Sequence, residues 1–248
     1  MRKSVAYVGT RNIYQHLIPS LKSLFAHTNV DTVYLLTEDD YFPEELPSVC
    51  KIVNVSGQTF FTPESPNYFG TRFTWMCMMR SALARVLTEE DMVLSLDFDT
   101  IINKDISCLW DVQMGDKLFM AASEPTKCKG GRWFRSDCKT TNEKYFNLGV
   151  AMYNLSALRS EQIDIKAINM LQTEKCAFLE QTAFNTICEN RFLEINPTFN
   201  SNNWTQIVSD PHITHFAAIK TEEWTQYEIV KKYMELPWGG KYEQKSEA

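Results

Sequence analysis

The feature that most constrains this chain is the alternation of short β-rich apolar segments with segments whose apolar residues recur every three or four positions. Residues 4–8 form a β-rich segment, and Ile13, Leu17 and Leu21 follow at helical spacing. Strand, helix and strand in repeated succession predict a mostly parallel sheet with helices on its faces. We therefore expect an α/β fold, in which ligands bind beyond the carboxyl ends of the strands.

The rest of the chain continues the two patterns. Further strands are predicted at residues 31–37, 51–55, 92–96, 117–122, 148–154 and 213–216. Further helices are predicted at residues 72–87, 156–173, 178–189 and 227–234. Pro19 is expected near the start of the first helix or at a kink in it.

Composition and sequence pattern argue against several classes of protein. The 248 residues carry a net charge of −6, whereas general nucleic-acid binding needs clustered Lys and Arg. No apolar run reaches the roughly 18–20 residues of a membrane span, and the start of the chain lacks the apolar core of a signal peptide. Seven cysteines without a C-x-x-C pair argue against a disulfide framework or a zinc site. We expect one domain over residues 1–240, a disordered tail over 241–248 and a reducing cytoplasm.

An acidic pair directly follows the apolar segment 92–96. Residues two apart in an extended segment point to the same side, so Asp97 and Asp99 can converge while Phe98 turns into the core. Convergent carboxylates beyond a buried strand suit a hard divalent cation, and a diphosphate could complete its coordination shell. Such a cation would stabilise charge on a departing nucleoside diphosphate. The alternative is that the triplet is only a turn or a helix cap.

Five motifs occur in order along the chain. They are Met79-Arg-Ser-Ala-Leu83 ahead of the acidic pair, Tyr145-Phe-Asn-Leu-Gly149, Leu179-Glu-Gln-Thr-Ala-Phe-Asn185, Phe199-Asn200 and His215-Phe-Ala-Ala-Ile-Lys220. Together they resemble glycosyltransferase family 8, the family of glycogenin and the bacterial lipopolysaccharide galactosyltransferases, over residues 5–224. The resemblance implies a GT-A fold and transfer of a hexose, glucose or galactose, from a UDP-sugar to a glycan, lipid-linked or protein acceptor. It also implies retention of the anomeric configuration and Mn²⁺, with Mg²⁺ as the alternative.

The same resemblance suggests roles for individual residues. Metal binding is assigned to Asp97, Asp99 and His215, and catalysis to Gln181 and Glu180. Donor binding is assigned to Val8, Gly9, Thr10, Asn12, Arg80, Asp97, Phe98, Asn147, Gly149, Ala218 and Lys220. Arg80 could instead pair with an acidic residue of the Asp-x-Asp motif and orient it. Gln181 is a poor nucleophile, which favours a same-face route, whereas Glu180 is the candidate if a covalent intermediate forms.

Two segments depart from the family pattern. Thr10 and Arg11 follow the first strand, where the family has acidic residues. Lys220 lies one residue closer to His215 than the family spacing, and Ala218 replaces the family's glycine. Donor binding at both places therefore depends on local backbone geometry.

Residues 127–135 form a locally basic segment between two predicted strands, where an active-site lid is expected. One interpretation is a solvated loop. The other is an acceptor site in which Arg132 and Arg135 bind an anionic group and Trp133 stacks on a sugar.

Two other function classes stay open. The first is a sugar nucleotidyltransferase, because Gly9-Thr-Arg11 resembles part of the glycine-rich phosphate loop of those enzymes, although the remaining glycines are absent. The second is a non-catalytic nucleotide-sugar or glycan-binding protein on the same fold. Pyrophosphate release would identify the first, and donor binding without turnover the second.

Overall fold

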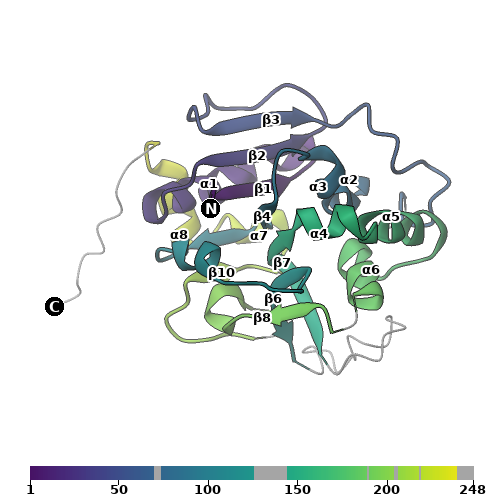
Figure 1. Cartoon of the computed structure of the whole chain (residues 1–248). Coiled ribbons are helices and arrows are strands. Elements are labelled where there is room, and N and C mark those ends of the chain that lie inside the picture. The colour runs from purple at the N-terminus through teal and green to yellow at the C-terminus, as the bar shows by residue number, and fades with distance from the viewer. Residues whose placement is uncertain (70–73, 126–143, 189, 204–205, 218, 239–248) are drawn as a thin grey trace.

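The computed structural model describes residues 1–248 except 70–73, 126–143, 189, 204–205, 218 and 239–248. Its central element is a seven-stranded sheet with the order β3-β2-β1-β4-β7-β6-β8 (Figure 1). The strands are β1 Ser4–Val8, β2 Thr32–Thr37, β3 Cys50–Asn54, β4 Met92–Leu96, β6 Phe119–Glu124, β7 Tyr145–Asn154 and β8 Phe192–Glu194. Strand β7 runs antiparallel to β4 and β6, and the other neighbours are parallel. The predicted mostly parallel α/β sheet is confirmed.

Helices cover both faces of this sheet (Figure 1). One side carries α2 Trp75–Met78, α3 Leu83–Val86, α4 Leu155–Ser160, α5 Ile163–Thr173 and α6 Leu179–Ile187. The other side carries α1 Tyr14–His27, α7 Thr221–Trp224 and α8 Glu228–Glu235. Alternation along β1 explains the layering, because Val5 and Tyr7 pack with α1 while Ala6 packs with the helices of the opposite side. The two cores are therefore divided by the sheet.

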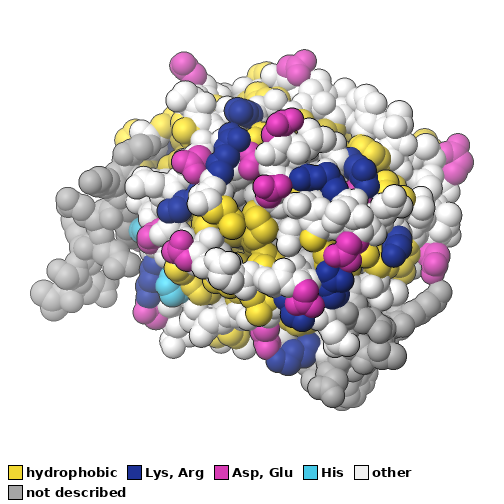
Figure 2. Space-filling view, viewed as in Figure 1, with side chains coloured by type: hydrophobic (Ala, Val, Ile, Leu, Met, Phe, Trp, Pro, Cys, Tyr) yellow, Lys and Arg dark blue, Asp and Glu magenta, His cyan; other side chains and the backbone are white. Residues whose placement is uncertain are grey.

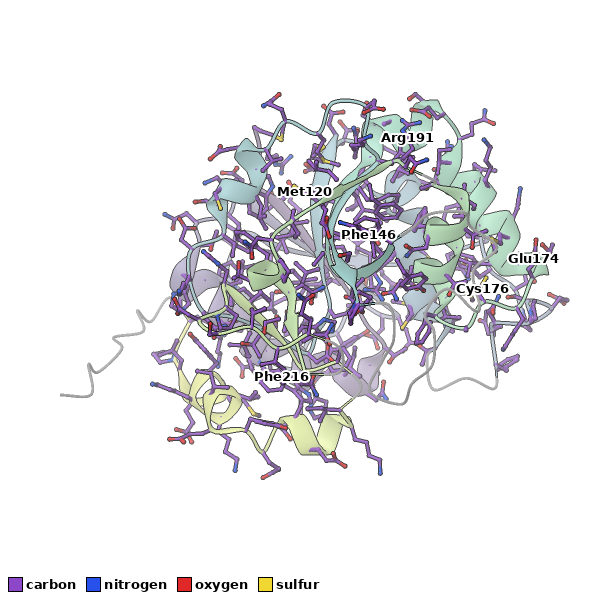
Figure 3. All side chains as sticks on the ribbon, turned by 90° about the horizontal axis from the view of Figure 1, so that it is seen from below. Met120, Phe146, Glu174, Cys176, Arg191 and Phe216 are labelled. Carbon is purple, nitrogen blue, oxygen red and sulfur yellow. The ribbon has the colours of Figure 1, made fainter. Side chains whose placement is uncertain are left out.

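A small second sheet lies against the carboxyl end of β4. Its strands, in the order β5-β10-β9, are β5 Thr100–Ile102, β10 Ile213–His215 and β9 Ser201–Asn202. Phe216, which directly follows β10, lies beside α7 and α8 (Figure 3) and packs with Trp224 and Tyr227 at ring-centroid distances of 5.8 and 4.9 Å. Four 3₁₀ segments complete the described elements: η1 Arg11–Ile13, η2 Met79–Ala82, η3 Ser107–Asp111 and η5 Pro197–Asn200.

Several predicted elements differ in detail. The helix predicted at 156–173 is two helices, α4 and α5, because Gln162 takes the left-handed conformation with φ 56°. The helix predicted at 72–87 is interrupted by the 3₁₀ segment η2, and its first two residues lie outside the described ranges. Pro19 lies inside α1 rather than at its start. Strands β5, β8 and β9 were not predicted, since they have only two or three residues each.

Three further properties of the described residues concern helix apolarity, the state of the cysteines and the distribution of surface charge. Within the described part of the chain, none of the helices has the length and apolarity needed to cross a membrane. Five cysteines in these ranges are free. On the face seen in Figure 2, the described Lys and Arg side chains are interspersed with Asp and Glu side chains. The tail predicted at 241–248 lies outside the described residues.

Candidate active site

A cavity of about 310 Å³ opens at the carboxyl ends of β1 and β4, where the fold class places ligands. Strand β7 starts at the same edge, because it runs antiparallel to β4 and the Asp97 amide donates to the Gly149 carbonyl at 2.7 Å. The cavity is lined by all of the predicted metal-binding and catalytic residues: Asp97, Asp99, His215, Glu180 and Gln181. Side chains that are distant in the sequence therefore meet at one end of the sheet.

The acidic pair and His215 are joined by the small sheet. Strand β5 directly follows Asp99, and antiparallel pairing with β10 sets His215 opposite Thr100. His215 Nε2 lies 3.3 Å from Asp97 Oδ2 and 3.4 Å from Asp99 Oδ1. The side chain of Asp97 is 27% exposed, that of Asp99 14% and that of His215 3%. The imidazole of His215 is therefore buried, whereas both carboxylates are partly exposed to the cavity.

These three side chains fit a divalent cation. One ligand atom from each, two carboxylate oxygens and an imidazole nitrogen, lie within 4.8 Å of one another. Oxygen and imidazole ligands of this kind suit first-row divalent metals and Mg²⁺. The alternative that the Asp-x-Asp triplet is merely a turn or a cap does not account for the imidazole at its side.

The carboxylates control the protonation of His215. Burial alone lowers the pKa of His215, but the neighbouring Asp99 and Asp97 carboxylates outweigh it and raise the pKa to about 10. Burial likewise acts to raise the pKa of Asp97, but the charges of Arg80 and His215 hold it well below its usual range. In the absence of a cation, the imidazolium therefore neutralises part of the acidic cluster, and a metal ion would displace its proton.

Arg80 bridges the partly exposed carboxylate of Asp97 and the buried carboxylate of Glu180. It projects from η2, and its Nη1 contacts Asp97 while its Nη2 lies 2.6 Å from Glu180 Oε1. Burial raises the pKa of Glu180 to about 7, against the opposing effect of Arg80. The alternative role for Arg80, pairing with an acidic residue of the motif and orienting it, is the one that this geometry favours.

Gln181 is held by its amide oxygen. Its Oε1 accepts a hydrogen bond from the Leu148 backbone amide at 3.0 Å, so the amide nitrogen is the group that remains for a ligand. The second half of α6 is fastened to β7 by Asn185, which accepts from the Phe146 amide at 2.8 Å and donates to the Phe146 carbonyl at 2.9 Å. Asn185 was quoted in a sequence motif without a role, and it positions Gln181 through this clamp.

Gly149 makes room for the acidic cluster. A Cβ atom at this position would lie 2.2 Å from His215 Cε1 and 2.7 Å from Asp97 Oδ2. Neighbouring Asn147 lines the cavity, and its Nδ2 donates to Glu124 at the end of β6. Glu124 was missed from the sequence, although an acidic residue that ends an apolar strand is the same signal that marked Asp97.

The end of β1 forms another part of the cavity wall. Val8, Gly9, Thr10 and Asn12 all line it, and Phe98 does so beside the acidic pair. The hydroxyl of Thr10 donates to Asn12 Oδ1. Arg11 turns outward instead, with its Nη1 3.3 Å from Asp39 Oδ2. The backbone and Thr10 thus stand where acidic residues occur in the family.

Among the described residues, one predicted donor-binding side chain, that of Lys220, is not brought into the cavity. Lys220 is exposed and is not among its described lining residues, which include Ala217. Ala218 lies outside the described residues, as do Arg132, Trp133 and Arg135 of the basic segment.

Comparison with known proteins identifies relatives along most of the chain. The model of glycosyl transferase family 8 matches residues 5–218. The glycosyltransferase GlyD of Streptococcus pneumoniae serotype 4 is 23% identical over 267 residues, covering 96% of this chain. The chain spans 30% and 33% of the lengths of the first two curated relatives that it matches.

Solved structures show the same GT-A fold. The galactosyltransferase LgtC, in complex with donor and acceptor sugar analogues, has a TM-score of 0.68 at 18% identity, over 94% of this chain and 97% of that one. Mouse xyloside xylosyltransferase 1 has a TM-score of 0.63 at 15% identity, over 88% of this chain and 98% of that one. Fold and family model agree, and this chain belongs to glycosyl transferase family 8.

Proposed function

We propose that this glycosyltransferase moves a hexose from a UDP-sugar to a glycan, lipid-linked or protein acceptor, with retention of configuration and with Mn²⁺ or Mg²⁺ bound. The observation that carries the proposal is the meeting of Asp97, Asp99 and His215 within 4.8 Å at the cavity that also contains Gln181. LgtC is named a galactosyltransferase and another relative a xylosyltransferase, so the fold is compatible with more than one sugar. Galactose and glucose are the donors to test first.

The metal would be held by Asp97, Asp99 and His215. When bound, such a cation supplies Lewis-acid stabilisation of the charge that develops on the departing diphosphate. Arg80 keeps Asp97 in place from the opposite side, because its guanidinium is fixed between Asp97 and Glu180. In this proposal, Val8, Gly9, Thr10 and Asn12 bind the nucleoside at the end of β1.

Gln181 supports a same-face route. Its oxygen is occupied by the Leu148 amide, so its NH₂ group is the part that can donate to the sugar or to the leaving group. The acceptor hydroxyl then forms a bond to the anomeric carbon on the face from which UDP departs. The bond from this carbon to the UDP oxygen breaks, and the hydroxyl proton passes to the departing diphosphate. Glu180, which is paired with Arg80, would be the nucleophile in the competing covalent route.

Two further assignments belong to the proposal. Lys220 and Ala218 would bind the diphosphate of the donor. Arg132, Trp133 and Arg135 would contact an anionic acceptor. Unchanged acceptor kinetics in Arg132→Ala and Arg135→Ala variants would exclude that acceptor site.

The test is UDP release from a panel of UDP-sugars in the presence of Mn²⁺. We expect slow hydrolysis of one donor, abolished by EDTA and by Asp99→Asn. Asp111→Asn makes the same chemical change at an exposed residue outside the cavity lining and should leave the rate unchanged. Mn²⁺-dependent donor binding without turnover, with every acceptor class supplied, would instead identify a binding protein.

A further inference from the structure

A chain of side-chain amides runs from the end of β6 to His215. Asn147 Oδ1 accepts hydrogen bonds from the Gly149 backbone amide and from Asn200 Nδ2, both at 2.9 Å. Asn200 Oδ1 in turn lies 2.9 Å from His215 Nδ1. At the other end, Asn147 Nδ2 donates to Glu124. Asn200 is 3% exposed and His215 2% exposed, so both side chains are buried.

The hydrogen bonds that link these side-chain amides can run in only one direction from donor to acceptor. A backbone amide can only donate, so the atom of Asn147 that faces the Gly149 amide must be its oxygen. The atom of Asn200 that faces this same oxygen must then be its NH₂ group, which leaves the Asn200 oxygen facing His215. The nitrogen that meets that oxygen, Nδ1, must carry a proton. A main-chain group on β7 therefore keeps the proton on Nδ1 whenever the His215 ring carries only one proton.

The remaining nitrogen faces the acidic pair. With Nδ1 held by Asn200, Nε2 lies between Asp97 Oδ2 and Asp99 Oδ1 at 3.3 and 3.4 Å. Asn200 is fixed in turn because it directly precedes β9, which pairs in parallel with β10. The stacking of Phe199 on His212, at a ring-centroid distance of 4.4 Å, holds the same segment.

We propose that Asn147 and Asn200 are positioning residues that fix the ring orientation and the Nδ1–H tautomer of His215, so that Nε2 is presented as a metal ligand. This inference rests on the metal site of the proposed function and adds to it the residues that prepare it. Hydrogen-bond partners of a ligating histidine commonly contribute about 10- to 100-fold to metal affinity.

These hydrogen bonds limit the part that Asn147, predicted as a donor-binding residue, can take in binding the sugar. Both acceptor positions of its oxygen are used, and one of its two N–H groups is directed to Glu124. A single N–H therefore remains for a sugar hydroxyl. Asn147 acts chiefly on the metal site and to a lesser extent on the donor.

The experiment compares the Mn²⁺ affinity of three purified proteins by titration calorimetry: the wild type, Asn200→Leu and Asn200→Asp. Leucine has the same number and branching of side-chain heavy atoms as asparagine but offers no acceptor to Nδ1–H, so we expect its affinity to fall by about 10- to 100-fold. Aspartate keeps the acceptor for Nδ1–H but loses the donor to Asn147 Oδ1, so its affinity should lie between those of the leucine variant and the wild type. A packing role predicts the reverse order, because leucine is neutral and aspartate buries a charge.

Thermal unfolding checks that each variant is folded, and Asn200→Ala replaces Asn200→Leu if the leucine variant has no wild-type-like transition. Equal affinity of the apolar variant and the wild type, or weaker binding by Asn200→Asp than by that variant, would overturn the positioning role and leave the metal site intact. A wild-type protein that binds no Mn²⁺ would overturn the metal site and this inference with it.

Discussion

The two ends of the central sheet both bury carboxylates, but they satisfy them differently. At the amino end, Glu90 is 3% exposed and receives hydrogen bonds from Ser4 at 2.8 Å and Tyr34 at 2.7 Å. Arg2 adds an ion pair at 3.0 Å. At the carboxyl end, Glu180 is 2% exposed and shares Arg80 with Asp97.

The difference separates a structural carboxylate from a functional cluster. Both oxygens of Glu90 have donors within the protein, as expected of a buried acid that stabilises the fold. At the carboxyl end, three carboxylates, those of Asp97, Asp99 and Glu180, face one guanidinium and one imidazole. Such an excess of negative charge is suited to binding a cation from solution.

The largest effect should come from removing a carboxylate at the carboxyl end. Asp99→Asn keeps the size of the side chain but removes one metal ligand, and we expect UDP release to fall by about 10³-fold, equivalent to several kcal/mol of lost charge stabilisation. We expect a smaller change in its free energy of unfolding, because the loss of a carboxylate beside His215 is partly offset by relief of the repulsion between Asp97 and Asp99. Initial rates and urea unfolding of the same preparation measure both. A variant that loses stability but keeps its rate would break the distinction between the two ends.

The matched change at the amino end, Glu90→Gln, should lower the stability of the protein and leave its rate of UDP release unchanged. Glu90→Gln leaves the donors of Ser4, Tyr34 and Arg2 incompletely satisfied, so we expect a loss of about 1–3 kcal/mol in the free energy of unfolding. The UDP release rate per folded molecule should be unchanged. A rate that falls with the protein fully folded would show that this end also takes part in catalysis.

A single methyl group added at Gly149 should disturb the carboxyl end of the sheet. Gly149→Ala would set a Cβ 2.2 Å from His215 Cε1, so the ring must shift, at about 1–3 kcal/mol, and Mn²⁺ affinity should fall by about tenfold or more. Gly57→Ala is the control, because a Cβ there meets no atom within 4 Å. Equal Mn²⁺ binding by the two variants would contradict the crowded site.

The smallest predicted effect, for a change of one pH unit, is the pH dependence of metal binding. Because the pKa of His215 is raised to about 10, Mn²⁺ must displace a proton, and its apparent affinity should rise by about tenfold per pH unit from neutrality toward pH 10. Without metal the sign is opposite: protonation of His215 stabilises the fold fully below its unfolded pKa of 6.5, and this is lost as the pH rises through about 10. Calorimetry in buffers of different ionisation enthalpy counts the proton, and release of none would contradict the pKa.

Much of the fold could be predicted because local periodicity determines it. Residues of β1 alternate between two cores, and the acidic pair follows β4 as its sequence indicates. Gln162 was missed because a left-handed residue other than glycine leaves no local pattern. The resemblance alone pointed to His215, since its approach to Asp99 depends on pairing between two three-residue strands, β5 and β10.

The hydrogen bonds from Asn147 through Asn200 to His215 could not be predicted from the sequence for a related reason. Asn147 and Asn200 meet through tertiary packing, and hydrogen-bond direction depends on atoms that sequence spacing does not place. Glu124 joins them only because β6 ends at the same edge of the sheet as β4.

In the proposed function, Asp97, Asp99 and His215 bind the cation of the reaction. Anomalous diffraction from crystals of the protein grown with Mn²⁺ and UDP tests it most directly. We expect one strong Mn²⁺ peak bonded to both carboxylates and to His215 Nε2, with His215 Nδ1 still facing Asn200. Mn²⁺ bound elsewhere, or no Mn²⁺ peak beside bound UDP, would contradict it.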